Sequence, residues 1–403
     1  MANLKLDTVS KIYPSGALAL YKINLELPDS QFIAVVGGEK SGKTSLLRII
    51  AGIEEETEGT VTISDKDVTS VEARERDVAM IFQGDTLYPS INVFENIAFP
   101  LKLRKAPAAL IEQRVKVVAE MLGLTEVLSR KPKALTTEQK QKTAFARAIA
   151  REPKLYLLDD PLAGLSGELK AKLRSVLINL QIRMKGTFIY ATKNVNEALT
   201  MATRVLVLRD GMVQQIDTPA NLYDYPVNTY VAFLIGSPTT NFLNNASVIK
   251  DESGYSVTLD GVTFHLPENI VKRFTAIDEY ANTDKKVIVG IRPEDMCISS
   301  EGIAAKVVAA EEIVGKAYCD CEADKLSFVV KGSAVKGDEV KIGADMTRAF
   351  VFDGVTRLTL LERDGGYVNT GFADADKIPL GYDEEEAVKN KLKLTKSDKK
   401  KKK

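Results

Sequence analysis

The chain has 403 residues, with 55 lysines and arginines against 55 aspartates and glutamates, so its formal net charge is zero. This balance excludes a strong global field that would draw the protein to nucleic acid or a membrane surface, and the length predicts two or three domains, each with its own core. The sequence has no apolar run of about 18 residues, so we expect no membrane-spanning helix, and its N-terminus lacks the apolar stretch of a signal peptide.

The N-terminal part predicts strands that lead into a phosphate-binding loop. Residues 4–36 alternate short apolar runs with turn residues, which is typical of β-strands. The last run, residues 32–36, precedes a segment that fits the pattern G-x-x-x-x-G-K-[ST], residues 37–44 (GGEKSGKT). A helix is expected from Ser45 to Ile50. This strand–loop–helix context favours a triphosphate site, because backbone N–H groups at a helix N-terminus attract phosphate.

The residue types of this loop predict how it holds ATP. Gly37 and Gly42 permit the tight backbone path. Lys43 places a charge on the β- and γ-phosphates, and Thr44 offers a hydroxyl to Mg²⁺. The other loop residues expected to contact the nucleotide are Gly38, Lys40, Ser41 and Ser45.

The middle of the chain predicts helices and then a parallel sheet. Residues 103–150 are rich in Ala, Leu, Lys, Arg and Glu with helical periodicity. Residues 151–215 alternate β and α segments, as a parallel sheet with crossover helices does. In this region an apolar strand, residues 155–158, ends in the acidic pair Asp159-Asp160.

The C-terminal part has a different pattern. Beyond residue 240, short β-like runs separated by turn residues predict a small all-β domain. These runs are residues 247–249, 255–259, 287–291, 307–309, 327–330 and 350–352. Cys319 and Cys321 would share one face of a strand. We interpret them as buried or idle thiols, because the chain has only three cysteines and a metal site would need further ligands.

The end of the chain predicts a charged, disordered tail over residues 363–403. It contains an acidic block at residues 383–386 and ends in lysines at residues 399–403. Weak attraction of these lysines to anionic lipid headgroups or RNA is the alternative interpretation, and the acidic block opposes it.

Several segments outside the phosphate loop identify a family. They are residues 79–83 (AMIFQ), 87–89 (LYP), 93–101 (VFENIAFPL), 146–149 (ARAI), 236–238 (GSP), 241–243 (NFL) and 290–295 (GIRPED). With these segments the chain resembles the ATP-binding subunit of an ABC transporter over residues 4–362, and it is most similar to the carbohydrate-import branch related to the maltose-type ATPases. The resemblance implies an α/β P-loop NTPase (ABC ATPase) domain over residues 1–235, with a helical subdomain at about 84–135. A small all-β OB-like regulatory domain would follow over residues 236–362.

The resemblance also implies roles for three residues outside the loop. Tyr13 would stack on adenine, Gln83 would sense Mg²⁺ and the attacking water, and Asp159 would hold Mg²⁺ through water. Each has a simpler alternative. Tyr13 could be a turn residue, Gln83 an ordinary loop amide, and Asp159 a cap for the turn that follows its strand.

The strand end departs from the family pattern at a catalytic position. The family's strand ends Asp-Glu, and the glutamate positions and polarises water, whereas this chain has Asp160. Aspartate is one methylene shorter, so its carboxylate stops roughly 1.5 Å short, about one C–C bond. A catalytic misplacement of about 1 Å can cost around 100-fold in rate. The alternative is that Asp160 is tolerated with slower turnover.

The family signature Leu-Ser-Gly-Gly-Gln is replaced by LTTEQ at residues 135–139. In the family this segment contacts the γ-phosphate held by the partner subunit. Thr136 and Gln139 keep the spacing of a capping box, so the helix start is expected to survive. Thr137 adds a Cβ where phosphate must approach. Glu138 brings a negative charge that, at about 5 Å and an effective dielectric near 20, repels a phosphate charge by roughly 3 kcal/mol.

Other departures lie around the same phosphate. Lys193 stands where the family has its switch histidine. It could donate to the γ-phosphate but cannot present a neutral imidazole. Asn194 and Ser166 each replace an expected aspartate, and Glu39-Lys40 replaces a small residue and a glycine in the phosphate loop.

The leading hypothesis is the energy-coupling ATPase subunit of an ABC importer for sugars or related small solutes, with ATP and Mg²⁺ as cofactors. The resemblance implies a homo- or heterodimer, membrane permease subunits at the cytoplasmic face of the cell membrane, and indirectly an external solute-binding protein, but no nucleic acid. The altered motifs favour low or partner-dependent turnover, as in the degenerate half of a heterodimer.

Two other classes remain open. A non-catalytic ATP-binding regulator would bind nucleotide as a ligand only. An ABC protein acting on nucleic acid or ribosomes usually carries two ATPase halves or long coiled-coil insertions, which this chain lacks.

Overall fold

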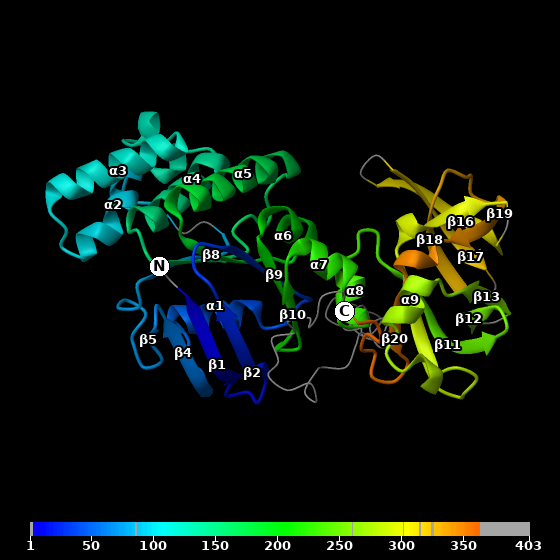
Figure 1. The fold of residues 1–403 in the computed structure, drawn as a ribbon. Coiled ribbons are helices and arrows are strands. Elements are labelled where there is room, and N and C mark those ends of the chain that lie inside the picture. Colours follow the sequence, from blue (N-terminus) through cyan, green and yellow to red (C-terminus); the bar gives the residue numbers. More distant parts are fainter. Residues whose placement is uncertain are drawn as a thin grey trace, which may run out of the picture. The chain divides into compact units, whose positions relative to one another are not determined.

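A computed structural model describes residues 3–362 except 85–86, 260, 301, 314–315 and 324–325. The predicted charged tail, residues 363–403, lies outside the described residues. The described chain forms two compact units, one up to Pro219 and one from Ala220 (Figure 1).

The first unit is built on two sheets. The larger, mixed sheet has the order β10-β9-β3-β8-β7-β6, in which only the pairing of β10 with β9 is antiparallel among the described strands. Its strands are β3 (Phe32–Val36), β6 (Val78–Ile81), β7 (Leu155–Asp159), β8 (Thr187–Ala191), β9 (Arg204–Arg209) and β10 (Met212–Asp217). An antiparallel sheet has the order β2-β1-β4-β5. It comprises β1 (Leu4–Ile12), β2 (Leu18–Leu27), β4 (Glu58–Ile63) and β5 (Lys66–Asp67).

The central strands are buried on both faces because two apolar cores lie against them. On β7, Tyr156 and Leu158 belong to one core, whereas Leu155 and Leu157 belong to the other. Since successive side chains of a strand point to opposite faces, this alternation explains why the sequence of β7 is continuously apolar.

Helices cover the two faces of the larger sheet. One core is shared with the antiparallel sheet and α1 (Lys43–Ala51). The other contains side chains of α2 (Val93–Leu103), α3 (Ala108–Leu122), α4 (Thr137–Ala150) and α5 (Gly167–Met184). The short helix α6 (Val195–Met201) follows β8. Helices α2, α3 and α4 pack together (Figure 1), and α2 and α3 lie within the segment predicted to be a helical subdomain.

The second unit combines an antiparallel sheet with a closed barrel. The sheet has the order β13-β12-β11-β14-β20, and the barrel has the order β15-β18-β17-β16-β19. The sheet strands are β11 (Asn241–Asp251), β12 (Gly254–Leu259), β13 (Val262–His265), β14 (Lys286–Ile291) and β20 (Phe350–Asp353). The barrel strands are β15 (Met296–Ser299), β16 (Ile303–Ile313), β17 (Lys316–Ala323), β18 (Leu326–Lys331) and β19 (Glu339–Ala344). The helices are α7 (Pro219–Asp224), which begins at the boundary, α8 (Thr229–Leu234) and α9 (Glu268–Arg273).

The structure confirms the predicted strand pattern of the C-terminal region. Each β-like run identified from the sequence lies within an observed strand. Cys319 and Cys321 are both buried on β17, as the strand periodicity predicts. The helices α7 to α9 were not predicted, because short helices give few turns of periodic pattern.

None of the helices in the described part of the chain combines the length and hydropathy needed to span a bilayer. Across the same residues, no group of three or more His, Cys, Asp or Glu side chains is placed to hold a metal ion.

Candidate functional site

The loop after β3 follows a path that glycine makes possible. Gly42 has φ +98°, in the left-handed region, and immediately precedes α1. A Cβ on Gly42 would lie 2.4 Å from the carbonyl oxygen of Ala19. A Cβ on Gly37 would lie 2.1 Å from the carbonyl oxygen of Leu208. Both predicted glycine roles are therefore supported by close backbone approach.

Lys43 is buried at the start of α1 and held by the loop itself. Its Nζ donates to the carbonyl oxygens of Gly37 at 2.8 Å and Gly38 at 2.7 Å, and to the hydroxyl of Ser41 at 2.9 Å. Burial is the main cause that lowers the pKa of Lys43 to about 8, and the positive charge of Lys193 lowers it further. The ammonium group is thus fixed in position, and it is less strongly protonated than a surface lysine.

Thr44 and Asp159 form a pair of oxygen ligands beside the loop. The Thr44 hydroxyl donates to Asp159 Oδ1 at 3.1 Å, which joins the start of α1 to the end of β7. Burial is the largest cause that raises the pKa of Asp159. A hydroxyl and a carboxylate are hard oxygen donors of the type that Mg²⁺ prefers, so these two residues fit a magnesium site.

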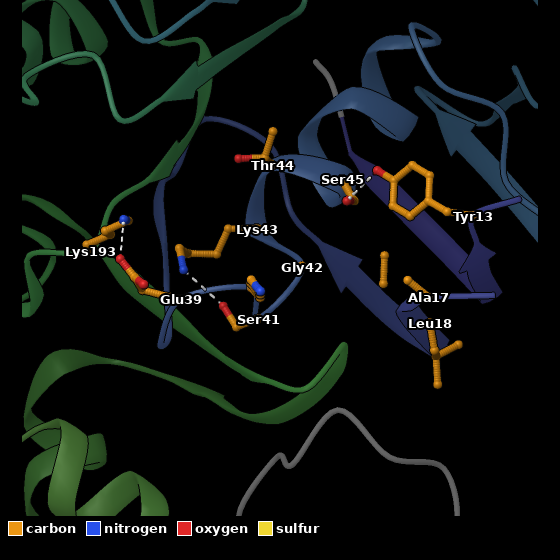
Figure 2. Close-up of a pocket in the computed structure, with 12 residues that line it drawn as sticks. Tyr13, Ala17, Leu18, Glu39, Ser41, Gly42, Lys43, Thr44, Ser45 and Lys193 are labelled. Carbon is orange, nitrogen blue, oxygen red and sulfur yellow. Dashed lines mark hydrogen bonds and ion pairs between the residues drawn. The ribbon is translucent and has the colours of Figure 1, made fainter. Parts of the chain in front are cut away.

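A pocket of about 580 Å³ opens over this loop (Figure 2). This volume lies within the ~300–1,000 Å³ typical of small-molecule sites. The predicted residues that line it are Tyr13, Lys40, Ser41, Gly42, Lys43, Thr44, Ser45 and Lys193. Gly37 and Gly38 do not line the pocket, but their carbonyl oxygens accept hydrogen bonds from Lys43, which does. Gln83, exposed just after β6, and Asp160 are not among the lining residues.

Four lining residues were not predicted as nucleotide contacts. They are Ala17, Leu18, Ala19 and Glu39. Ala17 lies just before β2, and Leu18 and Ala19 begin it. The sequence gives no local signal that this hairpin meets the phosphate loop. Glu39 could have been recognised, because it belongs to the loop that the sequence pattern identifies.

Tyr13 lines the pocket on the side of the β1–β2 hairpin (Figure 2). Its hydroxyl lies 2.9 Å from Ser45 Oγ and donates to Glu54 Oε2 at 2.7 Å. Glu54 is itself paired with Arg48 at 2.9 Å. Burial is the first cause that raises the pKa of Tyr13. The phenol is therefore anchored at its polar end while its ring faces the pocket.

Glu39 and Lys193 form an ion pair on the side of the pocket away from Tyr13 (Figure 2). Their charged groups are 2.9 Å apart, and both side chains are exposed. The bond from Lys193 lowers the pKa of Glu39, and Glu39 in turn raises the pKa of Lys193. Two substitutions relative to the family pattern, 154 positions apart, are thus joined in one ion pair.

Asp160 lies in a more acidic and less well bonded setting than Asp159. It has φ 45°, a left-handed conformation, and Thr192 Oγ1 lies at 3.4 Å from its Oδ1. Burial is the main cause that raises the pKa of Asp160, and the nearby Glu197 carboxylate adds to it. Among the described residues, the shorter side chain is therefore held by one long contact, and its carboxylate takes up a proton more readily than a free one does.

The altered signature keeps its helix start. Thr136 and Gln139 form a capping box on α4, which confirms that prediction. Glu138 is paired with Lys142 at 2.8 Å, one turn along the helix. This neighbour offsets part of the repulsion expected from an isolated carboxylate. Asn194 caps α6 by accepting from the backbone of Glu197.

Two family models match the chain. The ABC transporter model matches residues 20–163, and the MalK OB fold domain model matches residues 236–296. The oligosaccharides import ATP-binding protein MsmX of Bacillus subtilis (strain 168) is 38% identical over 372 residues, covering 89% of this chain and 100% of that protein. The trehalose/maltose import ATP-binding protein MalK of Thermococcus litoralis is 38% identical over 375 residues, covering 88% of this chain and 99% of that protein.

A solved structure is similar in fold. CbiO1 from Clostridium perfringens, part of the ABC transporter complex cbiONQ, aligns with a TM-score of 0.51 and 23% identity. The alignment covers 55% of this chain and 90% of that chain, and at this identity it concerns the fold alone.

Proposed function

The chain belongs to the ATP-binding subunits of ABC transporters, and from this premise we propose that it couples ATP hydrolysis to the import of sugars or related small solutes. Membership confirms the predicted ABC ATPase fold followed by an OB-like domain. The assembly we propose is a dimer of ATPase subunits at the cytoplasmic face of the cell membrane, bound to membrane permease subunits that receive solute from an external binding protein.

One observation carries the nucleotide part of this proposal. Lys43 and the Thr44–Asp159 pair lie together at the carboxyl ends of parallel strands, where open α/β sheets bind their ligands. Lys43 supplies a fixed positive charge for the β- and γ-phosphates. Bound Mg²⁺ would neutralise phosphate charge as a Lewis acid, held by Thr44 and Asp159. Tyr13 offers its ring to the base at the far side of the pocket.

The hydrolytic residues are proposed to act on the γ-phosphate from beside this pocket, because Asp160 and Gln83 do not line it. Asp160 is the proposed general base that orients water, with the Thr192 hydroxyl close to its carboxylate. Gln83 is proposed to contact water and Mg²⁺. Lys193 is proposed to donate to the γ-phosphate after leaving Glu39. Because Asp160 is one methylene shorter than the glutamate of the family pattern, we expect low turnover from this chain alone.

The signature segment is proposed to serve the opposite subunit. Residues 136–139 would face the nucleotide of the partner, where Glu138, even paired with Lys142, opposes the phosphate charge. This favours a heterodimer in which a paralogue with an intact signature and an Asp-Glu strand end supplies the more active site.

A groove beside β6 is the proposed docking site for a helix of the permease. It measures about 250 Å³ and lies among β6, α2 and α4. Leu103, at the end of α2, lines the groove and is 69% exposed. Tyr88 packs against Phe99 with tilted rings whose centroids are 4.5 Å apart. Arg151 also lines the groove, and its buried Nε and Nη2 have no partner among the described residues. An amphipathic helix with a hydrogen-bond acceptor would fit these groups.

Reconstitution in lipid vesicles tests the function. ATPase activity and solute uptake are measured for the permease with this chain, with and without a fuller-motif paralogue. We expect uptake only when this chain is present, and loss of uptake on Leu103→Glu. Val117→Glu, on an exposed position of α3 outside the groove, is the matched control. Uptake that is unaffected by omitting this chain would contradict the proposal.

A further inference from the structure

The second unit contains a polar cavity of about 290 Å³. Its charged lining consists of three arginines and two aspartates, Arg273, Arg292, Arg348, Asp224 and Asp295. These residues come from α7, α9, the link between β14 and β15, and the turn before β20. The cavity is close to the lower limit of the ~300–1,000 Å³ range of ligand pockets, so it has room for a small molecule only.

Arg292 is a buried cation, and one of its three side-chain nitrogens has no hydrogen-bond partner among the described residues. The residue is 1% exposed, and its guanidinium carbon lies 4.1 Å from the ring centroid of Tyr223. The two terminal nitrogens donate to Ala232 O at 2.7 Å, to Thr240 Oγ1 at 2.6 Å and to Tyr223 O at 2.9 Å. Its Nε has no partner within the described part of the chain. A buried donor without a partner is costly, so an acceptor at this point would stabilise the site.

Asp295 is a buried carboxylate with one unused acceptor. Its side chain is 8% exposed, and Oδ1 lies 3.4 Å from Arg348. Its Oδ2 has no partner among the residues that the structure describes. A hydroxyl group is the natural complement, because one hydroxyl donates to a carboxylate and can accept from an arginine.

The two outer arginines are available to an anion. Arg348 contacts Asp224 and Asp295 at 3.4 Å each, which is longer than the ~2.7–2.9 Å of a strong charge-assisted bond. The Nε of Arg273 donates to the carbonyl oxygen of Glu362, and its guanidinium carbon lies 5.3 Å from the ring centroid of Tyr225. Its terminal nitrogens make no hydrogen bond among the described contacts. The lining has one more positive than negative charge, so an oxyanion is favoured.

We propose that this cavity binds a small oxyanion that also carries hydroxyl groups, such as a monosaccharide phosphate. Arg273 and Arg348 bind the oxyanion, while hydroxyl groups donate to Asp295 and accept from Arg292. Such a ligand ties α7 and α9 to the sheet and barrel of the second unit. The site thereby makes this unit a sensor of a phosphorylated metabolite, and it does not rest on the transport function.

Calorimetric titration of the full-length chain tests the proposal, with glucose 6-phosphate as the probe and glucose and inorganic phosphate as the comparison arms. We expect glucose 6-phosphate to bind at least tenfold more tightly than either comparison compound. Arg348→Ala, at a half-exposed position, should weaken binding at least tenfold. Lys272→Ala, on the exposed face of α9, should leave it unchanged.

Two further variants separate this cavity from other effects. Lys43→Ala should leave glucose 6-phosphate binding intact, because the phosphate loop is a separate site. Asp295→Asn should reduce the preference for glucose 6-phosphate over inorganic phosphate while the variant keeps its melting temperature within a few degrees. The proposal is overturned if folded wild-type protein binds none of the three compounds at millimolar concentration. It is equally overturned if Arg348→Ala binds as wild type does, or if inorganic phosphate or glucose alone binds as tightly as the sugar phosphate.

Discussion

The phosphate loop and the γ-phosphate side of the pocket differ in how firmly their side chains are held. Lys43 is buried and makes bonds of 2.7 to 2.9 Å, and Thr44 bonds to Asp159 at 3.1 Å. On the other side, Asp160 has a contact of 3.4 Å, and Lys193 is an exposed lysine paired with an exposed glutamate. The groups proposed to bind phosphate are preorganised, and those proposed to cleave it are not. We therefore expect nucleotide binding and hydrolysis to be separable in this chain.

Removal of the buried Lys43 ammonium group is expected to have the largest effect. Lys43→Ala should lower ATP affinity by more than about 100-fold, because the lost charge-assisted bonds are worth roughly 3 kcal/mol or more. Fluorescence titration with a nucleotide analogue measures the effect. Lys272→Ala, an exposed lysine of the second unit, is the control. An affinity within threefold of wild type would show that the loop is not the main phosphate contact.

A longer carboxylate at position 160 is expected to have the second largest effect. Asp160→Glu restores about 1.5 Å of reach, and we expect kcat to rise by about 10- to 100-fold. ATP affinity should change little, because Asp160 does not line the pocket. Steady-state phosphate release measures kcat. A kcat that stays unchanged or falls would mean that Asp160 is already correctly placed.

The pH dependence of binding tests the burial of Lys43. Its pKa in the folded protein is about 8, lowered mainly by burial. The charged form binds phosphate, so ATP affinity should be constant below pH 7 and fall as the pH rises through 8, by about tenfold at pH 9. Because the unfolded chain binds more protons than the folded chain above this pKa, Lys43 itself makes folding more favourable as the pH rises toward its ordinary value of 10.5.

Lys43→Arg is the control for this profile, because arginine stays charged over the whole range. Its ATP affinity should be flat between pH 7 and 9. If wild type and Lys43→Arg have the same profile, another group governs the pH dependence.

The smallest expected effect concerns the exposed ion pair between Glu39 and Lys193. Glu39→Gln should raise ATP affinity by about two- to fivefold, because it removes a negative charge near phosphate and frees Lys193. ADP affinity should change less. Glu168→Gln is the matched control, because Glu168 forms a similar exposed ion pair with Lys172 at 2.8 Å, compared with 2.9 Å between Glu39 and Lys193. Equal changes for ATP and ADP would argue against a contact between Lys193 and the γ-phosphate.

The sequence predicts the secondary structure of this protein better than it predicts the tertiary contacts between distant residues. The glycines of the loop, the capping box at Thr136 and the strand at Cys319 follow from local patterns, because backbone geometry and periodicity are encoded over a few residues. The ABC ATPase fold and the OB-like character of the C-terminal domain were inferred from the resemblance to a family, and the strand order of the sheets was not predicted.

Contacts between distant residues could not be predicted. The approach of Ala19 to Gly42 depends on how the hairpin packs on the loop. The bond between Glu39 and Lys193 depends on β3 and β8 being neighbours in the sheet. The cavity of the second unit collects residues from Asp224 to Phe350, and nothing in the local sequence around any of them indicates a ligand.

The central claim is that this pocket binds ATP firmly but cleaves it poorly on its own. A single-turnover experiment tests it most directly, with labelled ATP and Mg²⁺ bound to an excess of the purified chain. The account predicts saturable binding with the ATP still intact after many minutes, and faster cleavage only with Asp160→Glu or a partner subunit. Conversion of the bound ATP to ADP at about 1 s⁻¹ or faster, the range of ordinary enzymes, would contradict it.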